Sequence, residues 1–120
     1  MSLATFFGAL TQMGPRFVVV TDGRHGAFLG TREEIHYCPV LESRVASTAG
    51  AGDAFSASFT ALIALGWAPP DALRDAAVNA ASVVSYVDTQ TGLLSLDEVE
   101  HRLAVAAPAL ATRTWSRQLR

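Results

Sequence analysis

The apolar positions of this chain form short continuous runs at first and helically spaced patterns further on. Phe17–Val20 is a continuous, largely β-branched run, which is typical of a strand covered on both faces in a parallel α/β sheet. The glycine-containing turn Asp22–Gly26 separates it from a second apolar run at Ala27–Leu29, and this pair predicts a hairpin. After a turn at Gly30–Glu33, we expect a third strand at Ile35–Cys38.

Two helices are predicted around these strands. The first covers 4–13 and ends at Gly14-Pro15, because glycine caps a helix and proline cannot continue its hydrogen bonds. The second covers 50–66, with Phe55, Phe59 and Leu62 spaced along its apolar side. The segment 40–48 between the strands and this helix has no clear period.

Two further helices follow. Pro69-Pro70 starts the third, with Asp71 as the expected N-cap and a buried stripe running from Leu73 to Val87. The fourth begins at Ser95-Leu96-Asp97-Glu98, which reads as a capping box, and extends toward Pro108. Arg113, Arg117 and Arg120 are expected in a frayed, solvated tail.

Composition excludes several chemistries. All nine basic residues are arginine, so the chain has no lysine to bind phosphate or form a Schiff base. The single Cys38 and the scattered His25, His36 and His101 do not suggest a metal centre, and we expect solvated or capping histidines and a small buried or half-buried thiol. The net charge of −2 does not favour nucleic-acid binding, and no apolar stretch is long enough for a membrane span, so a cytoplasmic protein is expected.

The chemistry-bearing segment is Gly50–Asp53, at the start of the second predicted helix. Glycines let the backbone approach a ligand, and the first N–H groups of a helix bind anions without lysine. A carboxylate beside them could accept a proton from a hydroxyl. The alternatives are a tight turn with a helix-stabilising Asp, or a dinucleotide fingerprint. The fingerprint fits poorly because Phe55 replaces its third glycine and no clean strand precedes Gly50.

Ser47–Phe55 closely resembles the signature Asp-Thr-Thr-Gly-Ala-Gly-Asp-x-Phe of the ribokinase-like, or PfkB, family of carbohydrate and nucleoside kinases. Val20–Ala27 resembles that family's Val-Thr-x-Gly-x-x-Gly nucleotide-binding turn. Asn79–Ala81 and Gly92–Ser95 resemble the helix and loop that line its adenine pocket. The resemblance implies an α/β fold, the C-terminal part of a three-layer α/β/α architecture with hairpin strands and about four helices.

The resemblance also implies an ATP-dependent carbohydrate kinase, which transfers the γ-phosphate of ATP to a hydroxyl of a sugar or related small molecule. By position, Asp53 would be the catalytic base. Gly50, Ala51 and Gly52 would supply the backbone anion hole for the transferring group.

Other positions would hold the nucleotide. Thr21, Gly23 and Gly26 would border the phosphates and ribose of ATP, and Asn79 would lie by the adenine. Magnesium would accompany ATP. For Asn79 the alternative is a helix residue that is satisfied locally or faces water.

Two departures from the family limit these expectations. Ser47 replaces the first signature Asp, a ligand in members activated by a monovalent cation, which argues against potassium activation. The chain is also less than half as long as a family member, so 1–120 reads as a single partial domain, the nucleotide-binding and catalytic-base half, without the N-terminal substrate and lid half. We expect it to associate with another copy or with the missing half, and to be inactive alone. The alternative is a non-catalytic nucleotide-binding or assembly module.

Overall fold

The computed structural model describes residues 1–106 and 110–116, within which there are four helices, four strands and one short 3-10 turn. In chain order these are α1 (Leu3–Gln12), β1 (Val18–Thr21), η1 (Gly23–His25), β2 (Ala27–Gly30), β3 (Glu34–Cys38), α2 (Ala51–Ala64), α3 (Pro69–Val83), α4 (Leu96–Ala106) and β4 (Arg113–Ser116). The predicted α/β class, with hairpin strands and about four helices, is confirmed. None of the helices described is long and apolar enough to cross a membrane.

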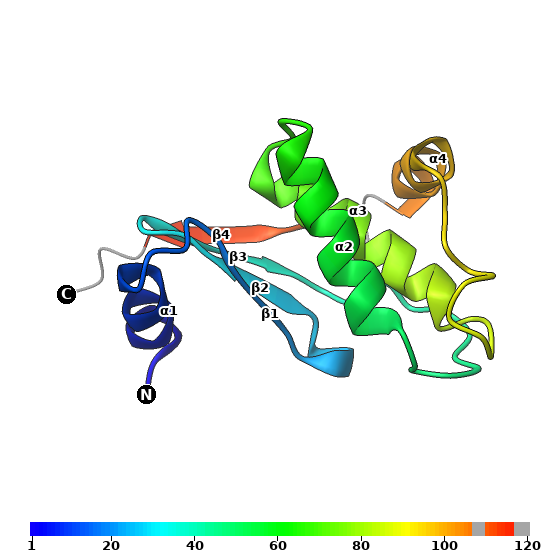
Figure 1. Ribbon diagram of the computed structural model, residues 1–120, viewed down its shortest axis with the longest axis horizontal. Coiled ribbons are helices and arrows are strands. Elements are labelled where there is room, and N and C mark those ends of the chain that lie inside the picture. The colour runs from blue at the N-terminus through cyan, green and yellow to red at the C-terminus, as the bar shows by residue number, and fades with distance from the viewer. Residues whose placement is uncertain (107–109, 117–120) are drawn as a thin grey trace.

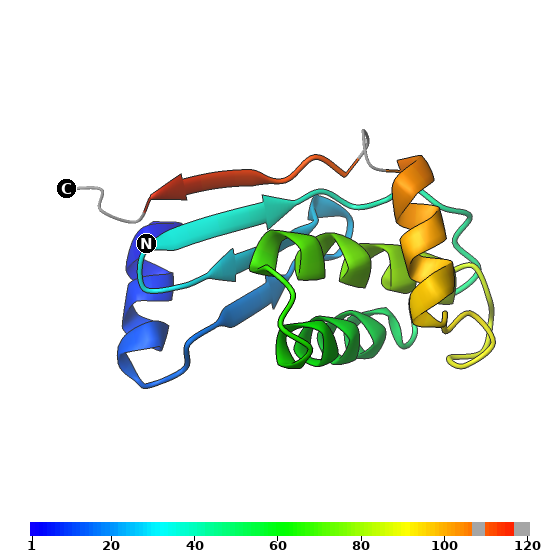
Figure 2. The same ribbon diagram turned by 90° about the horizontal axis from the view of Figure 1, so that it is seen from above.

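The four strands form one sheet in the order β1-β2-β3-β4, and every described pairing is antiparallel. Val20 lies opposite Phe28, and Phe28 in turn lies opposite Tyr37. The hairpin predicted from Phe17–Val20 and Ala27–Leu29 is confirmed, because the short turn through η1 returns the chain beside β1 as an antiparallel strand. Within the described residues β1 has no parallel neighbour. β1 is left as an edge strand (Figure 2).

Helices cover the two faces of the sheet unequally. α2 and α3 lie over one face, and α1 packs against the other face at one end (Figure 1). On the α1 side a Cβ at Gly30 would overlap the Phe7 ring, so glycine is what allows the helix this close. On the other side Leu29 joins a buried cluster with Phe59 and Leu73. This cluster fixes α2 and α3 over the sheet.

The two ends of α3 correct two expectations. Ala68, not Asp71, is the N-cap of α3, since Pro69 and Pro70 already occupy its first turn. The Asp71 carboxylate instead pairs with Arg74. α3 ends at Val83, so Val87 leaves the predicted buried stripe and is 79% exposed.

The capping box at the start of α4 is confirmed. The Ser95 N–H donates to Glu98 Oε2 at 2.8 Å, and the Glu98 N–H donates to Ser95 Oγ at 3.3 Å. The bonds from Ser95 lower the pKa of Glu98. The predicted end of this helix near Pro108 lies outside the described residues.

The C-terminal segment is not a frayed tail, because β4 pairs with β3 and Arg113 stands in that strand. Arg117 and Arg120 lie outside the described residues. The same pairing corrects the expectation of a solvated His36, which is 4% exposed. Its Nδ1 lies 2.8 Å from Thr114 Oγ1 and its Nε2 lies 3.2 Å from Glu34 Oε2. Burial lowers the pKa of His36, although Glu34 opposes that effect.

Candidate functional site

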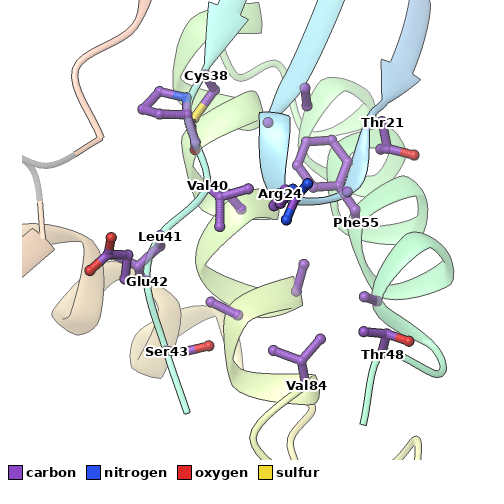
Figure 3. A pocket seen from close by; sticks show the side chains of 18 of the residues that line it. Thr21, Arg24, Cys38, Val40, Leu41, Glu42, Ser43, Thr48, Phe55 and Val84 are labelled. Carbon is purple, nitrogen blue, oxygen red and sulfur yellow. Dashed lines mark hydrogen bonds between the residues drawn. The ribbon is translucent and has the colours of Figure 1, made fainter. Parts of the chain in front are cut away.

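A cavity of about 630 Å³ opens where the hairpin turn, the start of α2 and one side of α3 meet (Figure 3). The chain that follows β3 closes a fourth side. The lining residues are Thr21, Gly23, Arg24, Gly26, Ala27, Cys38, Pro39, Val40, Leu41, Glu42, Ser43, Val45, Thr48, Ala51, Gly52, Phe55, Ala77, Ala80, Ala81 and Val84.

One wall of the cavity is apolar and open. α3 contributes Ala77 and Ala80, and its C-cap residue Val84 adds a third short apolar side chain, which leaves room above the helix. Val40 and Val45 face this space from the segment after β3 and are 43% and 62% exposed. Such a wall of small and uncovered apolar groups fits a flat, largely apolar ring.

The irregular segment 40–48 has a defined place because the end of α3 holds it. The carbonyl oxygen of Val84 accepts hydrogen bonds from the N–H of Ala46 at 2.7 Å and of Ser47 at 3.2 Å. These bonds use an end carbonyl of α3 that has no partner within the helix. They bring the chain back to the cavity just before α2 begins.

The hairpin turn is shaped by glycine at the cavity edge. Gly26 has φ 93°, and a Cβ there would overlap the backbone oxygen of Cys38. The Asp22 N–H donates to the Gly26 carbonyl at 2.8 Å and closes the turn. Thr21 and Gly23 are exposed and stand at the cavity wall.

The start of α2 offers unpaired N–H donors. Its N-cap, Gly50, has the left-handed φ of 79° and provides no capping side chain. The Ala51 N–H makes only a long contact of 3.4 Å with the Thr48 carbonyl. Among the described residues, the N–H groups of Gly52 and Asp53 have no acceptor. These donors and the helix dipole favour an anion here.

A neighbouring loop supports this helix start. A Cβ on Gly50 would lie 3.0 Å from the Thr89 side chain. Asp88 fixes the loop by accepting bonds from the N–H of Gln90 at 2.9 Å and of Thr91 at 2.7 Å, together with the Thr91 hydroxyl. Those bonds lower the pKa of Asp88 to about 2. The loop therefore limits how far the start of α2 can move.

The structure brings most of the predicted site residues to one cavity. Thr21, Gly23 and Gly26 line it from the hairpin, and Ala51 and Gly52 line it from α2. Gly50 and Asp53 flank that pair in sequence without lining the cavity themselves. The Asp53 side chain is exposed in the first turn of the helix.

Asn79 is not brought to the cavity. It is 6% exposed, its Nδ2 donates to Ser58 Oγ at 2.7 Å, and its Oδ1 accepts the Leu94 N–H at 3.0 Å. The cavity side of α3 carries Ala77 and Ala80 instead. These contacts favour the alternative of a locally satisfied helix residue.

Arg24 is the site residue that sequence reasoning overlooked. Its exposed side chain projects toward the cavity from the hairpin turn (Figure 3). Within the described part of the chain, its guanidinium has no hydrogen-bond or ion-pair partner. The absence of lysine could have pointed to Arg24, because in such a chain any basic side chain that binds phosphate must be an arginine.

Cys38 also lines the cavity and is 1% exposed, which confirms the expected buried thiol. Burial raises the pKa of Cys38 to about 12, so the thiol is neutral. In residues 1–106 and 110–116 no three histidine, cysteine or acidic side chains gather as a metal site would require.

Residues 3–96 match the family model described as pfkB family carbohydrate kinase. The chain belongs to this family. It is 36% identical over 81 residues to the 1-phosphofructokinase of Haloferax volcanii, covering 68% of this chain and 27% of that protein. It is 35% identical over 68 residues to fructosamine kinase FrlD of Bacillus subtilis, covering 57% of this chain and 24% of that protein.

The fold comparison agrees with the family. The Arabidopsis thaliana ribokinase complexed with ribose and ATP superposes with a TM-score of 0.76 at 24% identity, covering 83% of this chain and 33% of that chain. This PfkB chain therefore spans between about a quarter and a third of the length of the kinases that it matches.

Proposed function

We propose that this PfkB chain binds ATP in the cavity and supplies the nucleotide site and catalytic base of a kinase acting on a sugar hydroxyl. One observation carries the proposal. A single cavity joins an apolar wall on α3 to the unpaired N–H donors at the start of α2. That combination matches a molecule with an aromatic ring at one end and phosphates at the other.

The nucleotide fits the side chains present. The adenine would lie against Ala77, Ala80 and Val84, and the ribose and phosphates would pass the hairpin turn at Thr21, Gly23 and Gly26. Arg24 would contact phosphate oxygens from the same turn, and it replaces a lysine that this chain does not have. Asn79 would not contact the nucleotide itself and would support the site by holding α3 to α2 and to the loop at Leu94.

Magnesium is proposed to arrive with the nucleotide. The described residues form no group of three acidic, cysteine or histidine side chains, so phosphate oxygens and water would provide most of its ligands. The ion would neutralise charge on the β- and γ-phosphates. We do not expect potassium activation, because Ser47 replaces the family Asp and its Oγ accepts the Ala49 N–H at 3.2 Å.

The proposed reaction needs a base and an anion hole. The substrate hydroxyl oxygen would bond to the γ-phosphorus as the bond from that phosphorus to the β–γ bridging oxygen breaks. The hydroxyl proton would pass to the Asp53 carboxylate, and ADP would leave. Backbone N–H groups at Gly50, Ala51 and Gly52 would stabilise the negative charge on the transferring group.

The names of two relatives, a 1-phosphofructokinase and a fructosamine kinase, support a sugar or sugar derivative as the acceptor. The length of the chain supports a second candidate. Because it spans only about a third or less of these kinases, the 120 residues alone could be a nucleotide-binding module that needs another segment for turnover.

Calorimetry with Mg-ATP on the 120-residue chain tests the nucleotide site. We expect binding without ADP release when sugars are added. Absence of binding would contradict the proposed site, and ADP release by the chain alone would contradict the module.

The base is tested in a fusion of the chain behind the portion of the Haloferax volcanii relative that precedes its matched segment. There Asp53→Asn should lower kcat about 10²- to 10⁴-fold with little change in Mg-ATP affinity. The matched control is Asp97→Asn, an exposed carboxylate in the first turn of α4, which should leave kcat unchanged. Retained turnover in the Asp53 variant would remove it as the base.

A further inference from the structure

The end of the cavity that would hold the base of the nucleotide is lined by methyl groups. α3 contributes Ala77, Ala80 and Ala81, and Val40 and Val45 line the same space from the segment after β3. Both valines are exposed, so the space between this segment and α3 is open to water. Aliphatic side chains contact the faces of a flat ring but form no hydrogen bonds with its edge, so they hold a ring through the apolar area that is covered.

Most polar side chains of the cavity stand at its other end. Thr21 and Arg24 belong to the hairpin turn, and Thr48 comes just before the start of α2, where the phosphates would lie. Glu42 touches the cavity from the segment after β3, but its carboxylate points away from the space (Figure 3). These four side chains are therefore not placed to hydrogen-bond the edge of a base.

Ser43 is the polar side chain placed to meet the base. It is exposed, and Figure 3 shows its hydroxyl pointing into the cavity. The Cys38 thiol lines the cavity as well, but it already donates to the Pro39 carbonyl at 3.4 Å. A serine hydroxyl carries one donor and two lone pairs, and it rotates to suit its partner. It can therefore accept from the 6-amino group of adenine or donate to the 6-oxo group of guanine and hypoxanthine.

From this wall and this hydroxyl we infer that the cavity takes purine nucleoside triphosphates as a class, GTP and ITP as well as ATP. Such breadth rests on the proposed function, because the same wall would hold the adenine of ATP. An apolar pocket discriminates weakly between ligands of one shape, whereas strong rejection needs polar groups that the wrong ligand leaves unpaired. Ser43 would be paired by either kind of purine, and water beside the exposed valines would serve the rest of the base edge.

Calorimetry on the 120-residue chain with Mg-ATP, Mg-GTP, Mg-ITP and Mg-CTP tests this breadth. The three purine nucleotides should bind within about tenfold of one another, whereas a site built to hydrogen-bond one base edge would separate them by about 10⁴-fold. Mg-CTP should bind at least about threefold more weakly than the weakest purine nucleotide, because its single ring covers less of the apolar wall.

The outcomes separate this inference from the proposed function. If Mg-ATP does not bind, the proposed nucleotide site fails and the breadth fails with it. If Mg-ATP binds but exceeds Mg-GTP or Mg-ITP by more than about tenfold, only the breadth is overturned. Equal binding of Mg-CTP would show that the phosphates alone hold the nucleotide, which would overturn the role of the wall.

A matched pair of variants tests Ser43. Ser43→Asp replaces the hydroxyl with a carboxylate that only accepts, so the ratio of the Kd for Mg-GTP to that for Mg-ATP should rise at least about tenfold. Using the ratio removes any repulsion of the phosphates, which both nucleotides share. Ser2→Asp makes the same change at the N-cap of α1, where aspartate also caps, and should leave the ratio unchanged. An unchanged ratio in Ser43→Asp would remove Ser43 from the base edge and overturn the inference.

Discussion

Asn79 Nδ2 on α3 donates to Ser58 Oγ on α2 at 2.7 Å, and this bond joins the two helices that flank the nucleotide cavity. The carbonyl end of the same amide holds the Leu94 N–H. One side chain therefore fixes α3 against both α2 and the loop before α4. Asn79→Ala would leave two partly buried polar groups without partners, and we expect it to lower the free energy of unfolding by about 1–3 kcal/mol.

Urea unfolding measures this loss, and a double-mutant cycle with Ser58→Ala isolates the shared bond. Affinity for Mg-ATP should change less than about threefold, which is under about 0.7 kcal/mol. A tenfold loss of affinity with unchanged stability would instead support a direct contact between Asn79 and adenine.

Gly52→Ala should have opposite effects on the stability of the fold and on nucleotide affinity. No atom lies within 4 Å of a Cβ built at Gly52, so the helix should accept alanine and gain up to about 1 kcal/mol. The new methyl group would crowd a phosphoryl group at the unpaired N–H donors, and we expect Mg-ATP affinity to fall about tenfold, or about 1.4 kcal/mol. Thermal unfolding and calorimetry on the same sample check both effects. Unchanged affinity would contradict a phosphate position at the start of α2.

Arg24→Ala should weaken nucleotide binding without weakening the fold. Its guanidinium has no partner among the described residues, while a charged hydrogen bond to phosphate contributes about 1.5–3 kcal/mol, which corresponds to a loss of at least about tenfold in affinity. Arg32→Ala, an exposed arginine in the turn at the opposite end of β2, is the matched control and should bind normally. Equal affinities for the two variants would exclude Arg24 from the phosphate site.

Asp75 predicts a pH dependence of stability. Its side chain is fully buried on α3, and within the described residues neither carboxylate oxygen has a hydrogen-bond partner. Burial, followed by the charges of Glu100 and Asp71, raises the pKa of Asp75 to about 6, while Arg74 opposes this. Since the folded-state pKa lies above the unfolded value, stability should fall as the pH rises from about 4 to about 6.

Asp75→Asn keeps the shape and removes the titration, so it should stabilise the chain at pH 7 by up to about 3 kcal/mol. Below about pH 4 the two proteins should have equal stability. Unfolding measured across this range checks the difference, with the exposed Asp97→Asn as a control that should show none of it. A constant difference at every pH would show that packing, not ionisation, distinguishes the variants.

The sequence determined the features that depend on neighbouring residues. The capping box at Ser95 and Glu98 and the helix start at Gly50–Asp53 were predicted because caps and helix termini are set within one turn. The hairpin followed from glycines between two apolar runs. The family resemblance rested on the helix start and the hairpin turn, together with Asn79–Ala81 and Gly92–Ser95, and the family is confirmed.

Tertiary structure decided what depends on distant partners. The pairing of β4 with β3 contributes to the burial of His36, and it joins residues far apart in sequence. The cavity needs the segment 40–48, which has no period of its own and is held by the carbonyl of Val84. The motif placed Asn79 at the cavity, but residues two or three positions apart on a helix can lie on different faces. Which face of α3 lines the cavity depends on how the helix packs, and that face carries Ala77 and Ala80. Local propensity sets where an element begins and ends, while burial against other elements sets which of its faces meets the ligand.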